Sequence, residues 1–169
     1  GAPVDSHAES MRYYEALCEF ASRSLVAANV HLLGWRSDIR DILEASDVYV
    51  STSYSESFPD TVREAMAVSM PVVVTDVGGT SELVRVGESG YLFQPGDVAS
   101  LIGYLRELVR APALRSGMGM KGKQIIEEGF STATYVKNFE DMVLSSLPRG
   151  RGRWALRSTS DTTIDSGIT

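Results

Sequence analysis

The chain has little cysteine, no long apolar run and no excess of positive charge. Its single cysteine, Cys18, excludes an internal disulfide and suits a reducing compartment. No apolar stretch approaches the ~20 residues that a membrane helix requires, and no signal-peptide pattern opens the chain. The net charge of −6 provides no electrostatic footprint for nucleic acid. We therefore expect a cytoplasmic protein that does not bind nucleic acid.

Metal ligands are also scarce. The two histidines, His7 and His31, have no second histidine, cysteine or carboxylate at ligand spacing. The chain also lacks a D-x-D pair of the kind that often holds a divalent cation. The sequence therefore predicts neither a metal site nor a bound cofactor.

Apolar residues make up 43% of the chain, enough for one sizeable core, and we expect a single domain at residues 1–147. Residues 148–169 are rich in Arg, Ser and Thr, and their four arginines and two aspartates give a net charge of +2. Such a segment buries too little apolar surface to offset the entropy of ordering, so we predict a disordered tail. Peripheral contact with acidic lipid headgroups is the alternative role for its arginines and Trp154.

The apolar pattern alternates between strands and helices. We expect strands at 30–33, 48–51, 72–74 and 91–93. We expect helices at 11–27, 39–45, 61–69, 81–84, 98–109, 114–128 and 134–147, with Asp97 capping the fifth of them. Alternation of this kind implies parallel pairing with right-handed crossovers. The predicted fold class is α/β, a Rossmann-like parallel sheet with flanking helices.

The most informative segment is ESFPDTVRE at residues 56–64. Pro59 suits the first position of a helix, where a missing N–H costs nothing. The next amides, from Asp60 to Val62, then have no partner within the helix. Such amides, helped by the helix dipole, make a site for phosphate. Because the segment follows a predicted parallel strand, it stands at the sheet edge where such folds bind ligands.

A carboxylate stands on either side of this predicted phosphate site. Glu56 lies just before it, and Glu64 lies one turn into the helix. Carboxylates only accept hydrogen bonds, which suits the vicinal hydroxyls of sugars and ribose. A phosphate between two polyols describes a nucleotide sugar. A purely structural explanation is also open, since an acidic residue in the first helical turn stabilises a helix by about 0.3–1 kcal/mol.

Further segments accompany this one at fixed distances. In chain order they are GWRSD at 34–38, ASDVYVSTS at 45–53, REAMA at 63–67, MPVVVTDVGG at 70–79 and GESGYLFQPGD at 87–97. In this order and spacing, residues 1–147 resemble the C-terminal, donor-binding domain of the retaining glycosyltransferases of family 4. The resemblance implies one half of a GT-B fold, truncated at its N-terminus. The family's opening strand, glycine-rich turn and helix with an Arg and a Lys for the diphosphate are absent from this sequence.

The resemblance also assigns roles to individual residues. Glu56 matches the family's first glutamate, which contacts the transferred sugar and is the candidate catalytic residue. Glu64 matches the second glutamate, which holds the ribose. Gly34 and Arg36 match a loop beside the nucleotide base. The residues that match the loop around the sugar and diphosphate are Ser57, Phe58, Pro59, Asp60 and Thr61. Ser57 replaces the usual glycine, which narrows the φ range of that loop.

The resemblance implies a parent enzyme that transfers a sugar from a UDP-, GDP- or ADP-sugar to an acceptor, with retention and without a metal. The acceptor would be a saccharide, a lipid or a small molecule, bound by a missing N-terminal domain. Without that domain and the basic pair, we expect the isolated chain to be inactive. Two alternatives stay open, a nucleotide-sugar epimerase of the same architecture and a non-catalytic nucleotide-binding module.

Overall fold

The computed structural model describes residues 8–23 and 27–146, and the account below is confined to them. The predicted tail at 148–169 lies outside the described residues, so its disorder stays a prediction. The chain divides into two compact units, and the boundary between them in the sequence lies between Ser131 and Thr132. The second unit contributes one described helix, α7 (Thr132–Ser146), whose Tyr135, Phe139 and Met142 are exposed.

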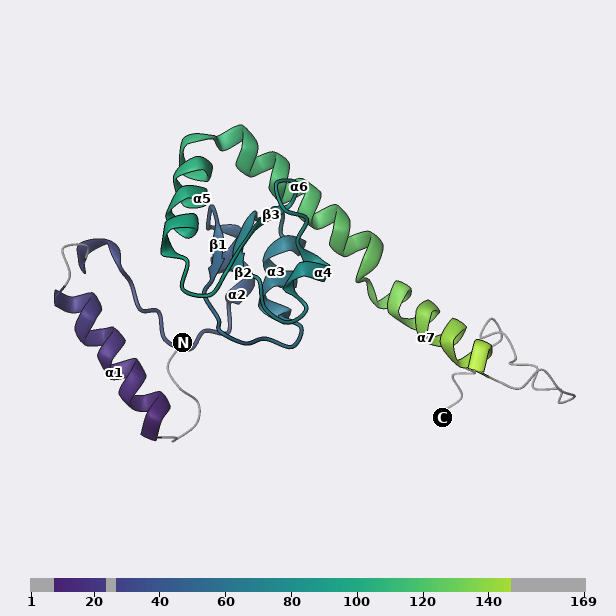
Figure 1. Ribbon diagram of the computed structural model, residues 1–169, viewed down its shortest axis with the longest axis horizontal. Helices are drawn as coiled ribbons and strands as arrows, with labels where there is room; N and C mark the ends of the chain where they lie inside the picture. The colour runs from purple at the N-terminus through teal and green to yellow at the C-terminus, as the bar shows by residue number, and fades with distance from the viewer. Residues whose placement is uncertain (1–7, 24–26, 147–169) are drawn as a thin grey trace, which may run out of the picture. The chain divides into compact units, whose positions relative to one another are not determined.

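The first unit alternates between helices and strands, as the sequence predicts (Figure 1). In chain order its elements are α1 (Ala8–Arg23), η1 (Ala27–Asn29), α2 (Ile39–Glu44), β1 (Tyr49–Ser51), α3 (Asp60–Ala67), β2 (Val72–Thr75), α4 (Thr80–Leu83), β3 (Gly90–Phe93), α5 (Val98–Arg110) and α6 (Pro112–Gly129). No helix of the described residues is long and apolar enough to cross a membrane.

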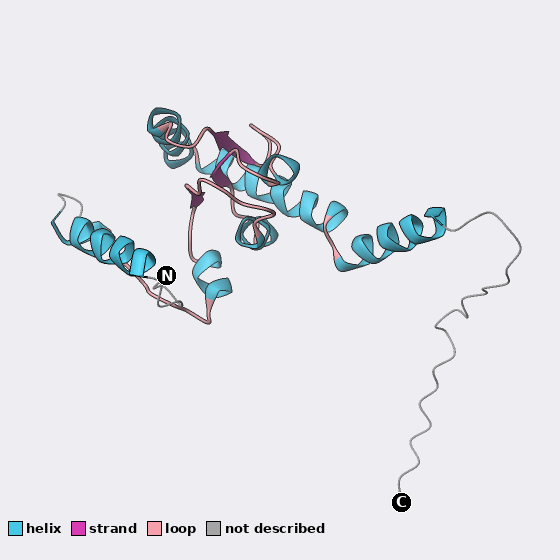
Figure 2. Ribbon diagram, turned by 60° about the horizontal axis from the view of Figure 1, so that its bottom comes forward, coloured by secondary structure: helices cyan, strands magenta, loops and turns pink. Residues whose placement is uncertain are grey.

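The three strands, drawn as magenta arrows in Figure 2, form one parallel sheet, and their order in it is β1-β2-β3. Tyr49 of β1 pairs with Val72 of β2, and Val74 of β2 pairs with Leu92 of β3. All four residues of β2 are buried, as expected for a central strand that is covered on both faces. The predicted α/β class with a parallel sheet and flanking helices is confirmed.

The strand predicted at 30–33 is wrong, because these residues adopt no regular structure. Val30, Leu32 and Leu33 are between 40% and 57% exposed. An apolar, β-branched pattern favours a strand only where a neighbouring strand can pair with its backbone. Among the described residues, β1 pairs with β2 alone, and nothing pairs with 30–33.

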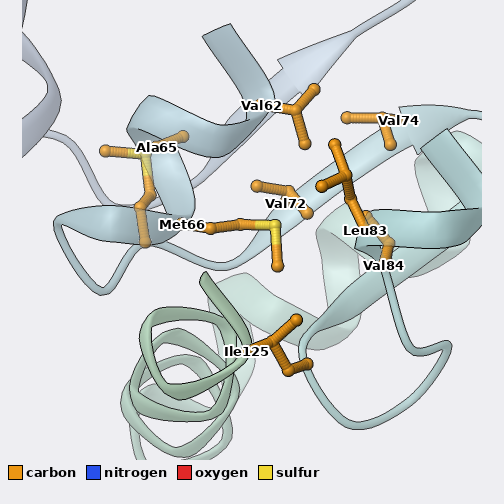
Figure 3. Packing of buried hydrophobic residues seen from close by; sticks show 9 residues of the cluster. Val62, Ala65, Met66, Val72, Val74, Leu83, Val84 and Ile125 are labelled. Atoms are coloured by element: carbon orange, nitrogen blue, oxygen red, sulfur yellow. The ribbon is translucent and has the colours of Figure 1, made fainter. Parts of the chain in front are cut away.

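Successive residues of β2 point to opposite faces of the sheet and organise two apolar clusters. On one face, Val72 and Val74 pack against α3, α4 and α6, and Figure 3 shows their side chains converging with Met66 and Ile125. On the other face, Val73 packs with residues of α5, β3 and α6, including Leu108. Full burial of each such side chain is worth roughly 1.5–3 kcal/mol, so this double packing fixes β2 as the centre of the fold.

Helix α6 approaches the α3–β2 turn closely through glycine. A Cβ built on Gly119 would lie 1.8 Å from the carbonyl oxygen of Ser69, and one on Gly122 would only touch Met66 at 3.5 Å. Ser69 itself has a positive φ of 63°, which a non-glycine residue adopts only in a tight turn. The close approach lets α6 cover the C-terminal part of α3 and the turn that leads into β2.

Candidate functional site

The loop between β1 and α3, residues 52–59, brings the predicted site residues to the carboxyl edge of the sheet. Tyr49 of β1 donates its hydroxyl to Thr61 Oγ1 at 2.8 Å, which ties the first turn of α3 to the strand. Thr75 at the end of β2 donates to the backbone carbonyl of Ser53 at 2.7 Å. Two strands therefore position this β1–α3 loop through side-chain hydrogen bonds.

Pro59 lies one position earlier than predicted. It is the cap residue, with φ −74° and ψ 111°, and α3 begins at Asp60. Its extended ψ keeps it outside the helix, while its carbonyl oxygen accepts the first bond of the helix, from the Arg63 amide at 3.4 Å. The amides of Asp60, Thr61 and Val62 precede that first bond, so the row of amides expected from the sequence stands at the start of α3.

The Gly78-Gly79 turn after β2 is in close backbone contact with this loop. A Cβ on Gly78 would lie 1.8 Å from the carbonyl oxygen of Glu56, and Gly78 has φ +54°. The Gly79 amide donates to the Ser57 carbonyl at 2.9 Å. A Cβ on Gly79 would lie 2.6 Å from the ring of Phe58. Only glycine allows this contact, and it fixes the backbone of residues 56–58.

Thr80 holds the glycine turn in shape. Its side chain is buried, and its hydroxyl accepts from the Val77 amide at 3.0 Å. The same hydroxyl lies 2.7 Å from the Val77 carbonyl and 3.0 Å from the Thr75 carbonyl, either of which can take its proton. Thr80 is not among the site residues that the sequence predicts. The signal was a threonine directly after a glycine pair, because a hydroxyl there can bond back to the turn.

The two glutamates stand apart from the ion pairs of the structure. Glu56 is half-buried in the loop, and Glu64 is exposed on α3. Neither carboxylate forms an ion pair with any residue that the structure describes. Glu64 also borders a hollow of about 420 Å³ between α2 and α3, lined by Ile39, Arg40, Leu43, Ala67 and Val68. Both carboxylates can therefore accept hydrogen bonds from a ligand.

The segment with Gly34 and Arg36 has mainly local contacts. Gly34 has φ +65°, which permits a turn that L-residues rarely adopt. The Arg36 guanidinium donates to both carboxylate oxygens of Asp38, at 2.7 and 2.5 Å. This pair raises the pKa of Arg36 and lowers that of the Asp38 carboxyl. In this structure Arg36 is therefore bound to Asp38, and a ligand that uses it has to compete with that carboxylate.

Within residues 8–23 and 27–146, no three His, Cys, Asp or Glu side chains come together in a metal-binding arrangement. The chemical groups that residues 56–64 carry are backbone amides, two carboxylates and the hydroxyl of Thr61. Such a set can hold an anion between two groups of hydroxyls.

This region falls inside a stretch that matches a known family. Residues 12–125 match the family model described as Glycosyl transferases group 1. The chain belongs to this family. It represents the C-terminal half of the family's GT-B fold, as the resemblance in its motifs implies.

Individual relatives agree with the family. The D-inositol 3-phosphate glycosyltransferase of Rhodococcus opacus is 33% identical over 158 residues, which is 85% of this chain and 35% of that protein. A galactosyltransferase of Escherichia coli that acts on a GlcNAc-diphosphoundecaprenol is 33% identical over 116 residues, 69% of this chain and 30% of that protein. The chain thus spans about a third of the length of the curated relatives it matches.

Solved structures share the fold. HepE of Anabaena in complex with UDP superposes with a TM-score of 0.76 at 26% identity, over 81% of this chain and 38% of that one. The C-terminal domain of LpcC, a group 1 glycosyl transferase of Francisella tularensis, has a TM-score of 0.65 at 20% identity, over 73% of this chain and 65% of that domain. The second likeness concerns the fold alone.

Proposed function

We propose that this chain is the donor-binding half of a glycosyltransferase that moves a sugar from a nucleotide-diphosphate donor to an acceptor. HepE, a similar structure, was solved with UDP and with UDP-glucose, which supports a nucleotide sugar as the ligand here. The observation that carries the proposal is the row of amides at Asp60, Thr61 and Val62, with an unpaired carboxylate on either side. Because the chain spans about a third of its relatives' length, the proposal assigns acceptor binding to another part of the protein.

In this proposal the first turn of α3 receives the diphosphate. Negative charge grows on the leaving diphosphate as the bond to the sugar breaks, and preorganised amides stabilise such charge at no cost of reorganisation. Three amides cannot neutralise two phosphates, so cations from elsewhere in the protein complete the site. With that help we expect the reaction to need no metal, and the family resemblance implies that it proceeds with retention.

The two glutamates divide the recognition of the hydroxyls. Glu64, exposed on α3, would accept hydrogen bonds from the ribose and hold the nucleoside. Glu56 would orient the transferred sugar as the catalytic residue. Its backbone carbonyl is in close contact with Gly78. The Phe58 and Pro59 backbone, and Ser57, would line the sugar side of the loop. Gly34 and Arg36 would lie beside the base.

The acceptor would be a saccharide, a lipid or a small molecule, and we place the reaction in the cytoplasm. An epimerase of similar architecture differs in one measurable way, because it converts its nucleotide sugar when no acceptor is present. A transferase of the parent protein would show turnover only after acceptor is added. A non-catalytic module would bind nucleotide and turn over in neither case.

The experiment is a calorimetric titration of the chain with UDP, GDP and ADP. Glu64→Ala should raise the Kd of the preferred nucleotide about tenfold or more, because a hydrogen bond to a charged group is worth about 1.5–3 kcal/mol. Glu127→Ala is the matched control, since Glu127 is also an exposed helical glutamate and its contact with Lys123 is a 3.9 Å surface pair. Equal affinities for wild type, Glu64→Ala and the control would contradict the assignment.

A further inference from the structure

Arg63 contacts both the β1–α3 loop and the start of α3. It lies on α3 directly before Glu64, and its guanidinium carbon is 5.3 Å from the centroid of the Phe58 ring. The same guanidinium forms an ion pair with Asp60, the first residue of α3. A cation over an aromatic face is attracted by the ring quadrupole, so both contacts pull the loop and the helix start together.

The Arg63 side chain is held rather than free in solvent. It is 36% exposed, whereas the Asp60 side chain is 73% exposed. Its Nε atom is buried and has no hydrogen-bond partner among the described residues. A buried N–H without an acceptor costs free energy. The ring of Phe58 and the carboxylate of Asp60 are the groups that offset this cost.

Phe58 links Arg63 to the rest of the site. Its ring lies 5.7 Å from the ring of Phe130 at the end of α6, with an interplanar angle of 40°. On another side it leaves no room for a Cβ at Gly79. The ring is therefore enclosed by the glycine turn, Phe130 and Arg63. These contacts anchor the side chain of Phe58, and Phe58 precedes the row of amides directly in the chain.

The ion pair has a second consequence, for charge. Asp60 places a carboxylate at the same helical turn whose amides would receive a diphosphate. Two anions at the same helical turn repel each other. Arg63 neutralises the carboxylate from within the same helix, three residues on. The site can then accept an anion although an aspartate stands beside it.

We propose that Arg63 is a positioning residue for the nucleotide-diphosphate site. It holds the Phe58 ring, and thus the loop, and it offsets the charge of Asp60. The inference rests on the proposed function, because the ligand is the same. No role for Arg63 follows from the sequence, since its place in the motif implies neither the ring contact nor the ion pair.

The test is calorimetry with UDP on three variants. Arg63→Leu keeps the aliphatic packing and removes both contacts, and we expect its Kd to rise about five- to thirtyfold. Arg63→Lys keeps the charge without the planar group, and its Kd for UDP should lie between those of Arg63→Leu and wild type. Adding Asp60→Asn to Arg63→Leu should recover part of the loss. Arg106→Leu, an exposed residue of α5, is the control and should bind as wild type.

A nucleotide-free measurement separates this inference from the proposed function. The Gly79 amide donates to the Ser57 carbonyl, so its hydrogen exchange reports how firmly the loop is held. Arg63→Leu should exchange at Gly79 about five- to tenfold faster, with no change at Leu108 in the core on the opposite sheet face. If wild type fails to bind UDP but this acceleration appears, the positioning role stands and the proposed ligand falls.

Unchanged exchange at Gly79 together with unchanged UDP affinity would overturn the inference. A loss of affinity in Arg63→Leu that Asp60→Asn does not relieve, with unchanged exchange at Gly79, would also overturn it. If circular dichroism shows that Arg63→Leu does not fold, Arg63→Lys decides, and wild-type exchange and affinity in that variant would contradict the contact with the Phe58 ring.

Discussion

At the scale of single residues, Gly78 shows how the site depends on backbone contact. Gly78→Ala should destabilise the chain for two reasons, the left-handed φ of +54° and the overlap with the Glu56 carbonyl. The first costs about 1–2 kcal/mol, and the overlap adds about 1–3 kcal/mol. Urea unfolding measures the sum, and UDP affinity should fall with it because the loop has to move.

Gly87 supplies the matched control for this variant. Its φ is +79°, but a Cβ there would meet nothing within 4 Å. Gly87→Ala should therefore lose only the cost of backbone strain and leave UDP affinity unchanged. Equal losses of stability in the two variants would show that the contact with Glu56 has no energetic weight.

A second residue, Asp97, links stability to pH. Ser100 donates to Asp97 from its hydroxyl at 2.6 Å and from its amide at 3.1 Å, and these bonds lower the pKa of the Asp97 carboxyl. The depressed pKa means that the stabilisation is present above the unfolded pKa of about 3.9 and is lost as pH falls through the folded value. The hydrogen bond from the Ser100 amide to the Asp97 side chain confirms the cap predicted at the start of α5.

Asp97→Ala should therefore lower the melting temperature at pH 7 and have a smaller effect at pH 3. Wild type and variant should converge as the carboxyl is protonated. Ser116→Ala, at an exposed position, serves as the control for side-chain truncation. A difference in melting temperature that stays constant between pH 7 and pH 3 would contradict the role of the ionised cap.

Some of these residues could be predicted from the sequence and others could not, for a physical reason. Free amides after Pro59 follow from local backbone rules, so the start of α3 could be predicted to within one residue. The contact between Gly78 and Glu56 joins two segments that only the parallel sheet brings together. The ring contact of Arg63 with Phe58 depends on rotamers that packing selects. Contacts of this second kind have no local signal.

At the scale of elements, the packing of α6 on the α3–β2 turn provides a prediction. Gly119→Ala should destabilise the chain by about 1–3 kcal/mol, because the new Cβ would meet the Ser69 backbone, which cannot rotate away. Gly117→Ala lies in the same helix with nothing within 4 Å. That control should stabilise the chain by about 0.5–1 kcal/mol, the ordinary gain of alanine in a helix.

Chemical denaturation of both variants gives the two differences. Effects of the same sign would mean that α6 does not pack closely at Gly119.

The same elements show what a pattern can predict. The all-apolar run of β2 is enough to predict a strand covered on both faces, because one strand supplies that pattern itself. Residues 30–33 have a similar pattern, yet a strand also needs a partner.

At the scale of the whole molecule, the parallel sheet brings two connecting segments together at one edge. The sheet order β1-β2-β3 places the loop after β1 and the turn after β2 beside each other at the carboxyl edge. Parallel folds bind ligands at this edge, so the topology and the motif agree on the same location. The fold class and the family could both be predicted from one sequence, and the location of the binding site at this edge stays a prediction. The identity of the donor could not be predicted, since it depends on a few side-chain contacts.

The central claim is that the start of α3 binds a nucleotide diphosphate, and a ¹⁵N-resolved titration of the chain with UDP tests it most directly. We predict the largest amide shifts at Asp60, Thr61 and Val62, with smaller shifts at Glu56 and Gly79. Uridine, which lacks the phosphates, should leave the first three amides nearly unmoved. Shifts by UDP at other residues that leave these three amides unchanged would contradict the account.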